Sequence, residues 1–273
     1  MKLAFSTLGC PDWDLDTVIN QAAKIGFNGI ELRGILKELD ITRLPEFSTR
    51  AKETVVKLEN AGIEIACFSS SVMMSNSGSA ISIESLDEIK RYADLCDTFQ
   101  TTNIRIFGGK IGGMSWDEAI ADAANNLEKM TRIIENSNIK IVVETHDDWM
   151  KGENFRKLMK IVNSEKVGIL WDVNHPFMFI GEEPEKSWQE MGKWVYHTHW
   201  KDAYVDENSE HGFLPCLMGD GILPHREIFD VLKDGGYDGY LSLEWEKRWH
   251  PEIPGPEIAF PQYKKYMKDL MAQ

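Results

Sequence analysis

Four apolar segments in the second half of the chain each end in a side chain that could bind a metal ion. These side chains belong to Glu144, Asp172, His199 and Glu244. A charged group at the end of a buried strand is costly unless it is paired or binds an ion. Three carboxylates and one imidazole suit Mn²⁺, Mg²⁺, Co²⁺ or Zn²⁺, and the oxygen-rich set favours the harder ions. The set therefore predicts one divalent-metal site built from several strand ends.

The spacing of these residues supports a common site. Glu144, Asp172 and His199 follow one another at intervals close to the ~30 residues of a βα unit. Any one of them alone is more simply explained as a helix cap or a partner in an ion pair. Taken together, carboxylates crowded at one end of consecutive strands would repel one another strongly without a cation. Glu244 lies further along because an irregular segment, about residues 203–223, precedes its strand.

Three further polar residues follow these strand ends closely and could contact a substrate. They are His146, His175 and Lys201. His175 is interpreted as a contact to a substrate oxygen, with a buried and internally satisfied histidine as the alternative. Lys201 and His175 would stabilise negative charge that develops on an oxygen during a reaction.

The other histidines are interpreted as structural or solvated. His197 lies two residues before His199 on the same strand face, so it would fill the interior beneath the site. His211, His225 and His250 fall in loops or at a helix start, and they are predicted to be exposed to solvent.

Short apolar strands alternate with helical segments along the chain. The expected strands cover about residues 2–6, 29–33, 63–69, 103–107, 139–145, 167–173, 194–200 and 239–245. The expected helices cover about residues 15–25, 45–61, 115–135, 153–163, 185–191, 225–233 and 258–271, with one more beginning at 83. Strict alternation implies parallel strands with right-handed crossovers. We therefore predict an α/β fold, a (β/α)8 TIM barrel, as a single domain over residues 1–273.

Local patterns mark some of the element ends. Ser115 and Glu118 have the spacing of a capping box that opens a helix. The Ser-, Gly- and Asn-rich residues 70–80 are predicted to form a long loop after the third strand. No Gly-x-Gly-x-x-Gly motif follows the first strand, so a dinucleotide-binding fold lacks its main evidence.

A short internal similarity links the second and eighth strands. Residues 26–30 lead to Glu31 through two glycines and an aromatic residue, and residues 236–240 lead to Glu244 in the same way. A repeated βα unit would produce this pattern of helix stop, turn, strand and terminal glutamate.

The composition excludes some classes of partner. A formal net charge of -14 disfavours long-range attraction to nucleic acid or to anionic membranes. No apolar run approaches the ~18 residues that span a bilayer, and the four cysteines show no C-x-x-C spacing. We predict a cytoplasmic protein that binds neither nucleic acid nor membrane. The last amphipathic helix is typical of core packing and leaves a homodimer open.

At these residues the chain resembles the xylose isomerase-like TIM-barrel superfamily, in particular its sugar phosphate isomerase/epimerase branch. That branch includes inosose dehydratase, hydroxypyruvate isomerase and the ketose 3-epimerases. The likeness covers essentially the whole chain. The motifs that carry it are Glu144 after a β-rich run, Asp172-x-x-His175, His199-x-Lys201-Asp202, and Glu244 closing the last strand.

The resemblance implies a site and a chemistry. In that family, residues that match Glu144, Asp172, His199 and Glu244 bind one divalent ion. The residue that matches His175 contacts a substrate oxygen, and the two glutamates serve as acid and base in the epimerases. The epimerase pattern is incomplete here, since Met150 lies in the region where the epimerases carry a second glutamate shortly after the fifth strand, and no arginine matches in residues 203–217.

These observations predict a divalent-metal-dependent isomerase or epimerase that acts on a small sugar or keto-sugar through a metal-stabilised enediolate. Glu144 and Glu244 would be its catalytic acid and base. A metal-dependent dehydratase or lyase that acts on a keto-sugar or cyclitol, similar to inosose dehydratase, would use the same site and is the alternative. A nuclease of the endonuclease IV type and a sugar-binding barrel without turnover are more distant alternatives.

Overall fold

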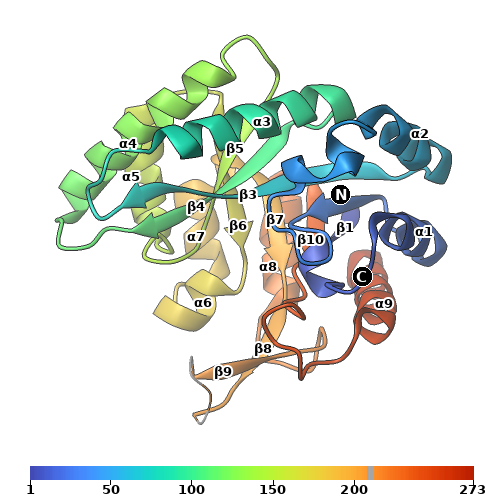
Figure 1. Cartoon of the computed structure of the whole chain (residues 1–273). Helices are drawn as coiled ribbons and strands as arrows, with labels where there is room; N and C mark the ends of the chain where they lie inside the picture. Colours follow the sequence, from blue (N-terminus) through green and yellow to red (C-terminus); the bar gives the residue numbers. More distant parts are fainter. Residues whose placement is uncertain (208, 210–211) are drawn as a thin grey trace. The chain divides into compact units, whose positions relative to one another are not determined.

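Eight parallel strands close into a barrel in the computed structural model, which describes residues 1–207, 209 and 212–273. The strands are β1 (Lys2–Ser6), β2 (Gly29–Leu32), β3 (Glu64–Asn76), β4 (Asn103–Lys110), β5 (Lys140–Glu144), β6 (Val167–Asp172), β7 (Val195–Trp200) and β10 (Tyr240–Leu243). Their hydrogen-bonded order is β1-β10-β7-β6-β5-β4-β3-β2 (Figure 1). The predicted (β/α)8 fold is therefore confirmed.

Helices lie between successive strands, as the alternation predicts. The α-helices are α1 (Leu15–Ile25), α2 (Ala51–Ala61), α3 (Ile83–Phe99), α4 (Trp116–Ile133), α5 (Gly152–Val162), α6 (His175–Ile180), α7 (Pro184–Met191), α8 (His225–Asp234) and α9 (Pro256–Ala272). The start of the helix expected over 45–61 is instead a short 3-10 turn, Pro45–Phe47, and another such turn, Ile41–Arg43, precedes it. The short helix α6, which begins at His175, was not predicted.

Caps at the helix ends follow the sequence signals. The Asp14 side chain accepts the Thr17 amide at the start of α1, and Gly26 ends that helix in the left-handed conformation. At the start of α4, Ser115 and Glu118 form the predicted capping box.

The chain forms two compact units. The first unit is Met1–Ile65 with Thr198–Gln273, and the second unit is Ala66–His197. The prediction of one domain over residues 1–273 stays a prediction. Among the described residues, no helix is both long enough and apolar enough to cross a membrane.

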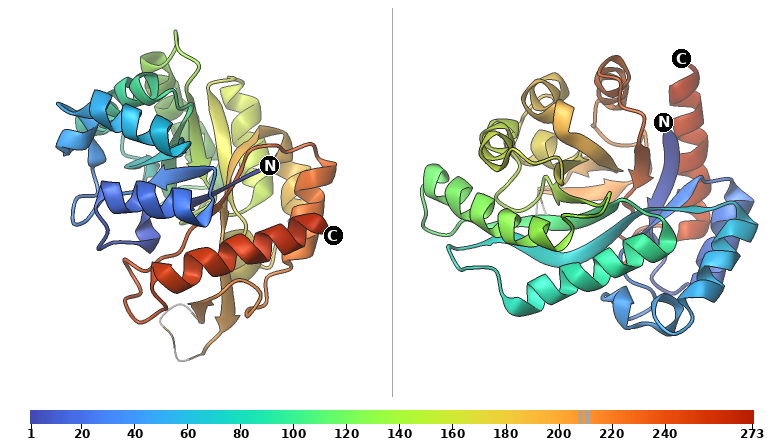
Figure 2. Two further views of the ribbon diagram at one scale, coloured as in Figure 1. Left: turned by 90° about the vertical axis from the view of Figure 1, so that its right-hand side faces the viewer. Right: turned by 90° about the horizontal axis from the view of Figure 1, so that it is seen from above.

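Aromatic rings build the core of the first unit. Phe5 of β1 packs against Phe27 and Phe260, with ring centres 4.9 and 4.2 Å apart respectively. Tyr263 stacks on Phe27, and its hydroxyl donates to the Leu241 carbonyl at 2.9 Å. These contacts fix α9 alongside α1 and β1 (Figure 2), so Phe5 and its alternate neighbours on β1 face the helices.

Strands β4, β5 and β6 form the centre of the second unit. Nearly every residue of these strands is buried, as expected where helices cover one face of a parallel sheet and side chains fill the other. Cys67, Val142 and Leu170 form a buried cluster beside Tyr196. This buried sheet carries the residues that follow β5 and β6.

Strand β3 is longer than its sequence suggests. It continues to Asn76, so the prediction of a loop over residues 70–80 was wrong for its first half. A register shift after Ser69 lets β3 resume pairing with β4, where Met73 faces Phe107. The polar composition concealed this strand, because its stability comes from the neighbouring strand rather than from local residue preference.

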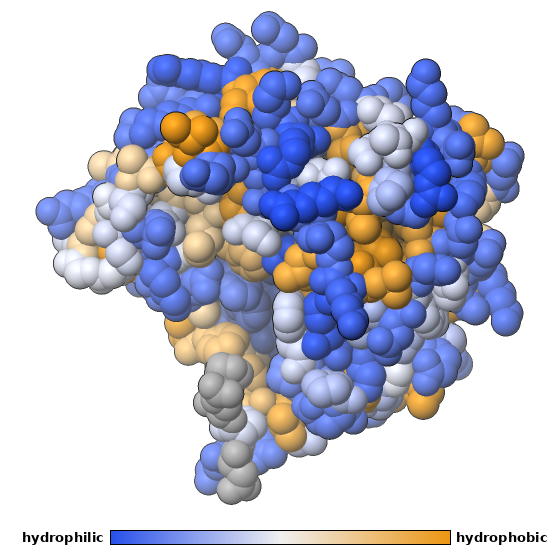
Figure 3. Space-filling view, viewed as in Figure 1, coloured by the Kyte–Doolittle hydropathy of each residue, from blue (hydrophilic) through white to orange (hydrophobic). Residues whose placement is uncertain are grey.

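A hairpin occupies part of the segment predicted to be irregular. It consists of β8 (Asp202–Val205) and β9 (Phe213–Cys216), which pair in antiparallel fashion. Residues 208, 210 and 211 of the same segment lie outside the described residues, as does the prediction for His211. Tyr204 and Val205 are hydrophobic side chains exposed to solvent on this hairpin. Most of the molecular face shown in Figure 3 is hydrophilic.

His225 is buried, so the prediction that it is solvated was wrong. It begins α8, and its Nε2 and Nδ1 lie 3.2 Å from the Lys201 carbonyl and 3.1 Å from the Tyr266 hydroxyl. Burial lowers its pKa, and the nearby Asp202 carboxylate partly opposes this effect. The sequence indicated that His225 begins a helix, but it did not indicate that Lys201 just after β7 and Tyr266 of α9 would cover this side chain. His250 is half-buried beside Glu246 and Glu252 rather than fully solvated.

Candidate functional site

His199 and Glu244 lie side by side in the first unit. His199 belongs to β7, and its parallel neighbour β10 ends one residue before Glu244. His199 Nδ1 is 3.3 Å from Glu244 Oε1, and both side chains are almost completely buried. Both therefore project from the C-terminal ends of their strands, where barrels of this kind form active sites.

Lys201 supplies positive charge to the carboxylates that follow β10. Its Nζ donates to Glu244 Oε2 at 2.5 Å and to Glu246 Oε1 at 2.9 Å. Burial raises the pKa of Glu244, but the charges of His199 and Lys201 and their hydrogen bonds outweigh it and hold that pKa well below its ordinary value. Glu244 is therefore an ionised carboxylate.

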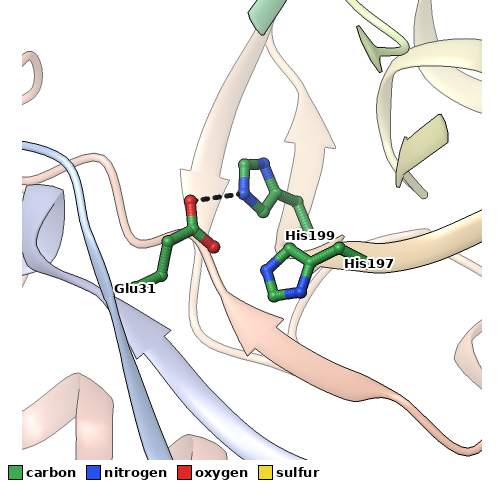
Figure 4. Close-up of side chains that lie close together, drawn as sticks. All are labelled: Glu31, His197 and His199. Carbon is green, nitrogen blue, oxygen red and sulfur yellow. Dashed lines mark hydrogen bonds and ion pairs between the residues drawn. The ribbon is translucent and has the colours of Figure 1, made fainter. Parts of the chain in front are cut away.

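Glu31, at the end of β2, holds the other side of the His199 ring. His199 Nε2 lies 2.8 Å from Glu31 Oε1, and the Ser242 hydroxyl donates to Glu31 Oε2 at 3.0 Å. All three side chains are fully buried. Figure 4 shows the bond between Glu31 and His199, and it shows His197 on the same strand as His199.

Glu144 and Arg105 form a buried ion pair in the second unit. Glu144 ends β5 and Arg105 lies on the adjacent β4, with Arg105 Nε 3.5 Å from Glu144 Oε2. Arg105 Nη1 donates to the Ser70 carbonyl at 3.2 Å, and its guanidinium lies over the Phe107 ring at 4.0 Å. A cation thus accompanies the buried carboxylate, which would otherwise be very costly.

Asp172 is positioned by the start of α6. Its Oδ1 accepts the backbone amides of Asn174 at 2.8 Å and His175 at 3.1 Å. The Thr145 hydroxyl exchanges two hydrogen bonds with the Asp172 backbone, at 2.9 and 3.1 Å. These hydrogen bonds position the end of β6 and orient the Asp172 carboxylate.

His175 and His146 pack against each other in the second unit. Their rings meet edge to face with centres 4.7 Å apart, and His146 also contacts Phe107 at 5.0 Å. His175 Nδ1 lies 2.9 Å from the Thr145 carbonyl, so Nδ1 carries a proton and donates it to that oxygen. His146 also bonds to Asp147 and thereby lowers the pKa of that carboxyl.

The structure groups the predicted site residues within each unit. His199, Glu244 and Lys201 are in contact in the first unit. Asp172 and His175 are in contact in the second, beside His146, and Glu144 ends the neighbouring strand. Their roles as ligands, catalysts or substrate contacts stay predictions.

Sequence reasoning missed three charged residues next to these positions. They are Glu31, Arg105 and Glu246. Glu31 had a signal, since the internal similarity placed it in the same position as Glu244. Arg105 also had one, because a charge inside an apolar strand demands a buried partner.

A family model described as xylose isomerase-like TIM barrel matches residues 19–268. This match covers most of the chain, and the barrel has the corresponding architecture. The protein therefore belongs to the xylose isomerase-like TIM barrel family, which confirms the resemblance seen in the sequence.

Curated relatives align over part of their length. An inosose dehydratase from Clostridium tetani is 26% identical over 170 residues, which are 57% of this chain and 56% of the relative. An inosose dehydratase from Clostridium beijerinckii is 27% identical over 160 residues, which are 54% of this chain and 53% of the relative. The alignments thus span just over half the length of these relatives.

Solved structures share the fold over nearly the whole chain. A probable 3-DHS dehydratase involved in petrobactin synthesis, from Bacillus anthracis, superposes with a TM-score of 0.80 at 20% identity, covering 98% of this chain and 99% of the other. The IolI protein with a bound zinc atom superposes with a TM-score of 0.78 at 20% identity, covering 99% and 98%. At this identity the likeness establishes the fold.

Proposed function

We propose that this protein is a divalent-metal-dependent hydro-lyase that removes water from a small keto-sugar or keto-cyclitol. The observation that carries the proposal is the set of buried carboxylate and imidazole donors at the strand ends in a chain whose curated relatives include inosose dehydratases. The relatives favour dehydration over the isomerisation that the sequence alone predicted. The carboxylate and imidazole donors favour a reaction that uses a bound divalent metal ion.

The donor set fits a divalent cation. His199 and Glu244 offer an imidazole nitrogen and a carboxylate in the first unit, and Glu144 and Asp172 offer two carboxylates in the second. All four are buried, and the carboxylates need positive charge to balance the cost of burial. Oxygen ligands with one imidazole suit Mn²⁺, Mg²⁺, Co²⁺ or Zn²⁺. A structural neighbour that holds a zinc atom adds support.

We assign Glu144, Asp172, His199 and Glu244 as the ligands of one such ion. Because the C-terminal ends of strands in a closed barrel form one rim, we expect residues at the ends of β5, β6, β7 and β10 to serve a single ion. When bound, the ion supplies Lewis-acid polarisation of the substrate's carbonyl oxygen.

The side chains of this chain then perform the proton transfers. One glutamate, Glu144 or Glu244, removes the proton from the carbon beside the carbonyl. A carbon–carbon double bond forms as the bond to the hydroxyl on the next carbon breaks. That hydroxyl takes up a proton and leaves as water. His175, His146 and Lys201 are proposed to bind the substrate's oxygens, and Lys201 is already a cation held by two carboxylates.

Isomerisation or epimerisation of a small sugar or keto-sugar is the second candidate. It is favoured by the presence of two strand-end glutamates, because one could remove a proton and the other return it. Both reactions start with the same proton removal. They differ in whether the neighbouring hydroxyl is lost, so the mass of the product separates them.

The test combines product mass with two matched variants. The purified protein, loaded with Mn²⁺ or Zn²⁺, is incubated with an inosose and with a panel of keto-sugars, and products are identified by mass spectrometry. A product that has lost one water supports the hydro-lyase. A product of unchanged mass that carries deuterium from D₂O shows an isomerase or epimerase instead.

The variants test the assigned residues. Glu144→Gln and Glu244→Gln are each expected to abolish turnover, whereas Glu64→Gln, at an exposed glutamate, should keep it. Full activity in either site variant would contradict the catalytic pair. Metal analysis should find about one divalent ion per chain, while about three zinc ions would favour the nuclease alternative. Sugar binding without any deuterium exchange would favour the barrel without turnover.

A further inference from the structure

We propose that Glu31 is a positioning residue that fixes the tautomer and direction of His199, so that Nδ1 of this histidine faces the metal ion. This inference rests on the proposed function for its metal, but the arrangement that it describes lies within the first unit alone. Glu31 was not among the residues expected from the strand ends of the second half.

The two nitrogens of the His199 ring face two different carboxylates. Nε2 is 2.8 Å from Glu31 Oε1, and Nδ1 is 3.3 Å from Glu244 Oε1. Glu244 is an assigned ligand of the ion, so the nitrogen on its side is the one that shares the ion with it. A neutral imidazole that binds a metal through one nitrogen carries its proton on the other. Nε2 must then donate to Glu31.

The strands between Glu31 and His199 leave room for this bond. Phe5 of β1 faces the helices, so Ala4 and Ser6 face the opposite side of the sheet. Ala4 is in register with Ser242 and Ser6 with Glu31. These small side chains allow the long glutamate on β2 to reach past β1 and β10 to the histidine on β7.

Ser242 holds Glu31 in turn. Its hydroxyl donates to Glu31 Oε2 at 3.0 Å, and Ser242 is also the register partner of His199 on the neighbouring strand. Each oxygen of the Glu31 carboxylate therefore has a hydrogen-bond donor in a fully buried site. A buried carboxylate bonded in this way is a strong acceptor for Nε2–H, and it makes Nδ1 a better metal ligand.

Nuclear magnetic resonance of the metal-free protein reads the tautomer at alkaline pH, where an imidazole ring is neutral and carries a single proton. Protein labelled with ¹⁵N-histidine is examined in long-range ¹H–¹⁵N spectra, and the His199 signals are identified by their absence in His199→Gln. We expect His199 of the wild type to carry its proton on Nε2. Glu31→Ala should lose this single tautomer and show exchange between the two. A wild-type His199 with its proton on Nδ1 would overturn the proposal.

Metal affinity supplies the second readout. Zn²⁺ binding is measured by competition with a chromophoric chelator for Glu31→Ala, Glu31→Gln and Ser242→Ala. The alanine variant at Glu31 should bind about 10- to 100-fold more weakly, as is typical when such a partner is removed. Glu31→Gln should lose less, because its amide oxygen still accepts from Nε2. Glu64→Ala, which removes an exposed carboxylate from the same unit, is the control and should bind as tightly as the wild type.

The outcomes separate this inference from the proposed function. A Glu31→Ala variant with wild-type affinity and an unchanged tautomer refutes the inference. Equal losses in Glu31→Ala and Glu31→Gln also refute it, since the hydrogen-bond acceptor would then be irrelevant. If Glu31→Ala has a non-native circular dichroism spectrum, Glu31→Gln and Ser242→Ala decide the question. If the wild type binds no ion, the proposed function fails, and the tautomer alone decides whether Glu31 positions His199.

Discussion

Replacing Lys201 with methionine should destabilise the metal-free protein substantially. Lys201 and Glu244 form a pair at 2.5 Å whose side chains are only 8% and 6% exposed. Methionine keeps the length and the apolar stem of lysine but removes the positive charge. Glu244 would then lie beside Glu246 in a buried place with less compensation.

The expected size follows from burial. Removing one partner of a buried ion pair costs about 3–5 kcal/mol, because the remaining charge stays desolvated. Glu244 keeps its contact with His199 at 3.3 Å, so the lower end, about 3 kcal/mol, applies. A domain of this size loses roughly 2 °C of Tm for each kcal/mol, which predicts a fall of about 6 °C.

Glu246→Gln is the matched control for this change. It removes the other carboxylate partner of Lys201, whose side chain is 23% exposed and better solvated. Its loss should therefore cost no more than about 1 kcal/mol. Urea unfolding and thermal scans of the wild type and both variants, in the presence of a chelator at neutral pH, measure the difference.

Two results would refute this reasoning. A Lys201→Met protein that melts within about 1 °C of the wild type would show that Glu244 does not depend on the lysine charge. A Glu246→Gln protein that loses as much stability as Lys201→Met would show that burial does not set the size of the effect. If the proposed metal site is correct, added Zn²⁺ should raise the Tm of Lys201→Met, since the ion restores positive charge beside Glu244.

Three other perturbations test the fold around the site. Burial lowers the pKa of His225, so below about pH 6.5 the unfolded chain binds a proton that the folded chain does not. The stability of the wild type should therefore decrease as the pH decreases from about 7.5 to 5.5. His225→Gln should reduce this pH dependence, as measured by urea unfolding at each pH. Ser115→Ala breaks the capping box of α4 and should cost about 1 kcal/mol in urea unfolding, and an unchanged midpoint would count against that role. Gly109→Ala would place a Cβ 2.1 Å from the Ser75 carbonyl at a φ of 82° and should cost more than about 2 kcal/mol. Gly113→Ala, with open space around it, should change stability by less than about 0.5 kcal/mol, and similar losses in both glycine variants would contradict the close approach of β3 and β4.

Local patterns were sufficient to predict the architecture. Apolar strands alternate with amphipathic helices, and the residues that cap these helices lie next to them in the sequence, as Asp14 and Gly26 do for α1. These interactions join residues that are close in the sequence, so the chain order reveals them. The strand-end positions of Glu144 and Asp172 followed from the same reasoning, because each residue ends an apolar run.

The limits of local reasoning appear where distant segments stabilise an element. Strand β3 continues through a polar stretch because β4 provides its hydrogen-bond partners, and the composition of residues 70–80 alone indicates a loop. The hairpin of β8 and β9 is fixed partly by Asp202, whose carboxylate accepts the amides of Gly219 and Gly221. Neither interaction has a signature within a single strand.

The sequence by itself therefore determined the fold class and the kinds of side chain at the strand ends. Only the tertiary structure decided which charged groups meet. Glu31 and His199 are separated by 168 positions, and their contact depends on the register of four strands and on small side chains between them. Lys201 finds Glu244 and Glu246 in the same way across neighbouring strands. The pairing of charges in a buried site depends on distances in space. The order of residues along the chain does not give these distances directly.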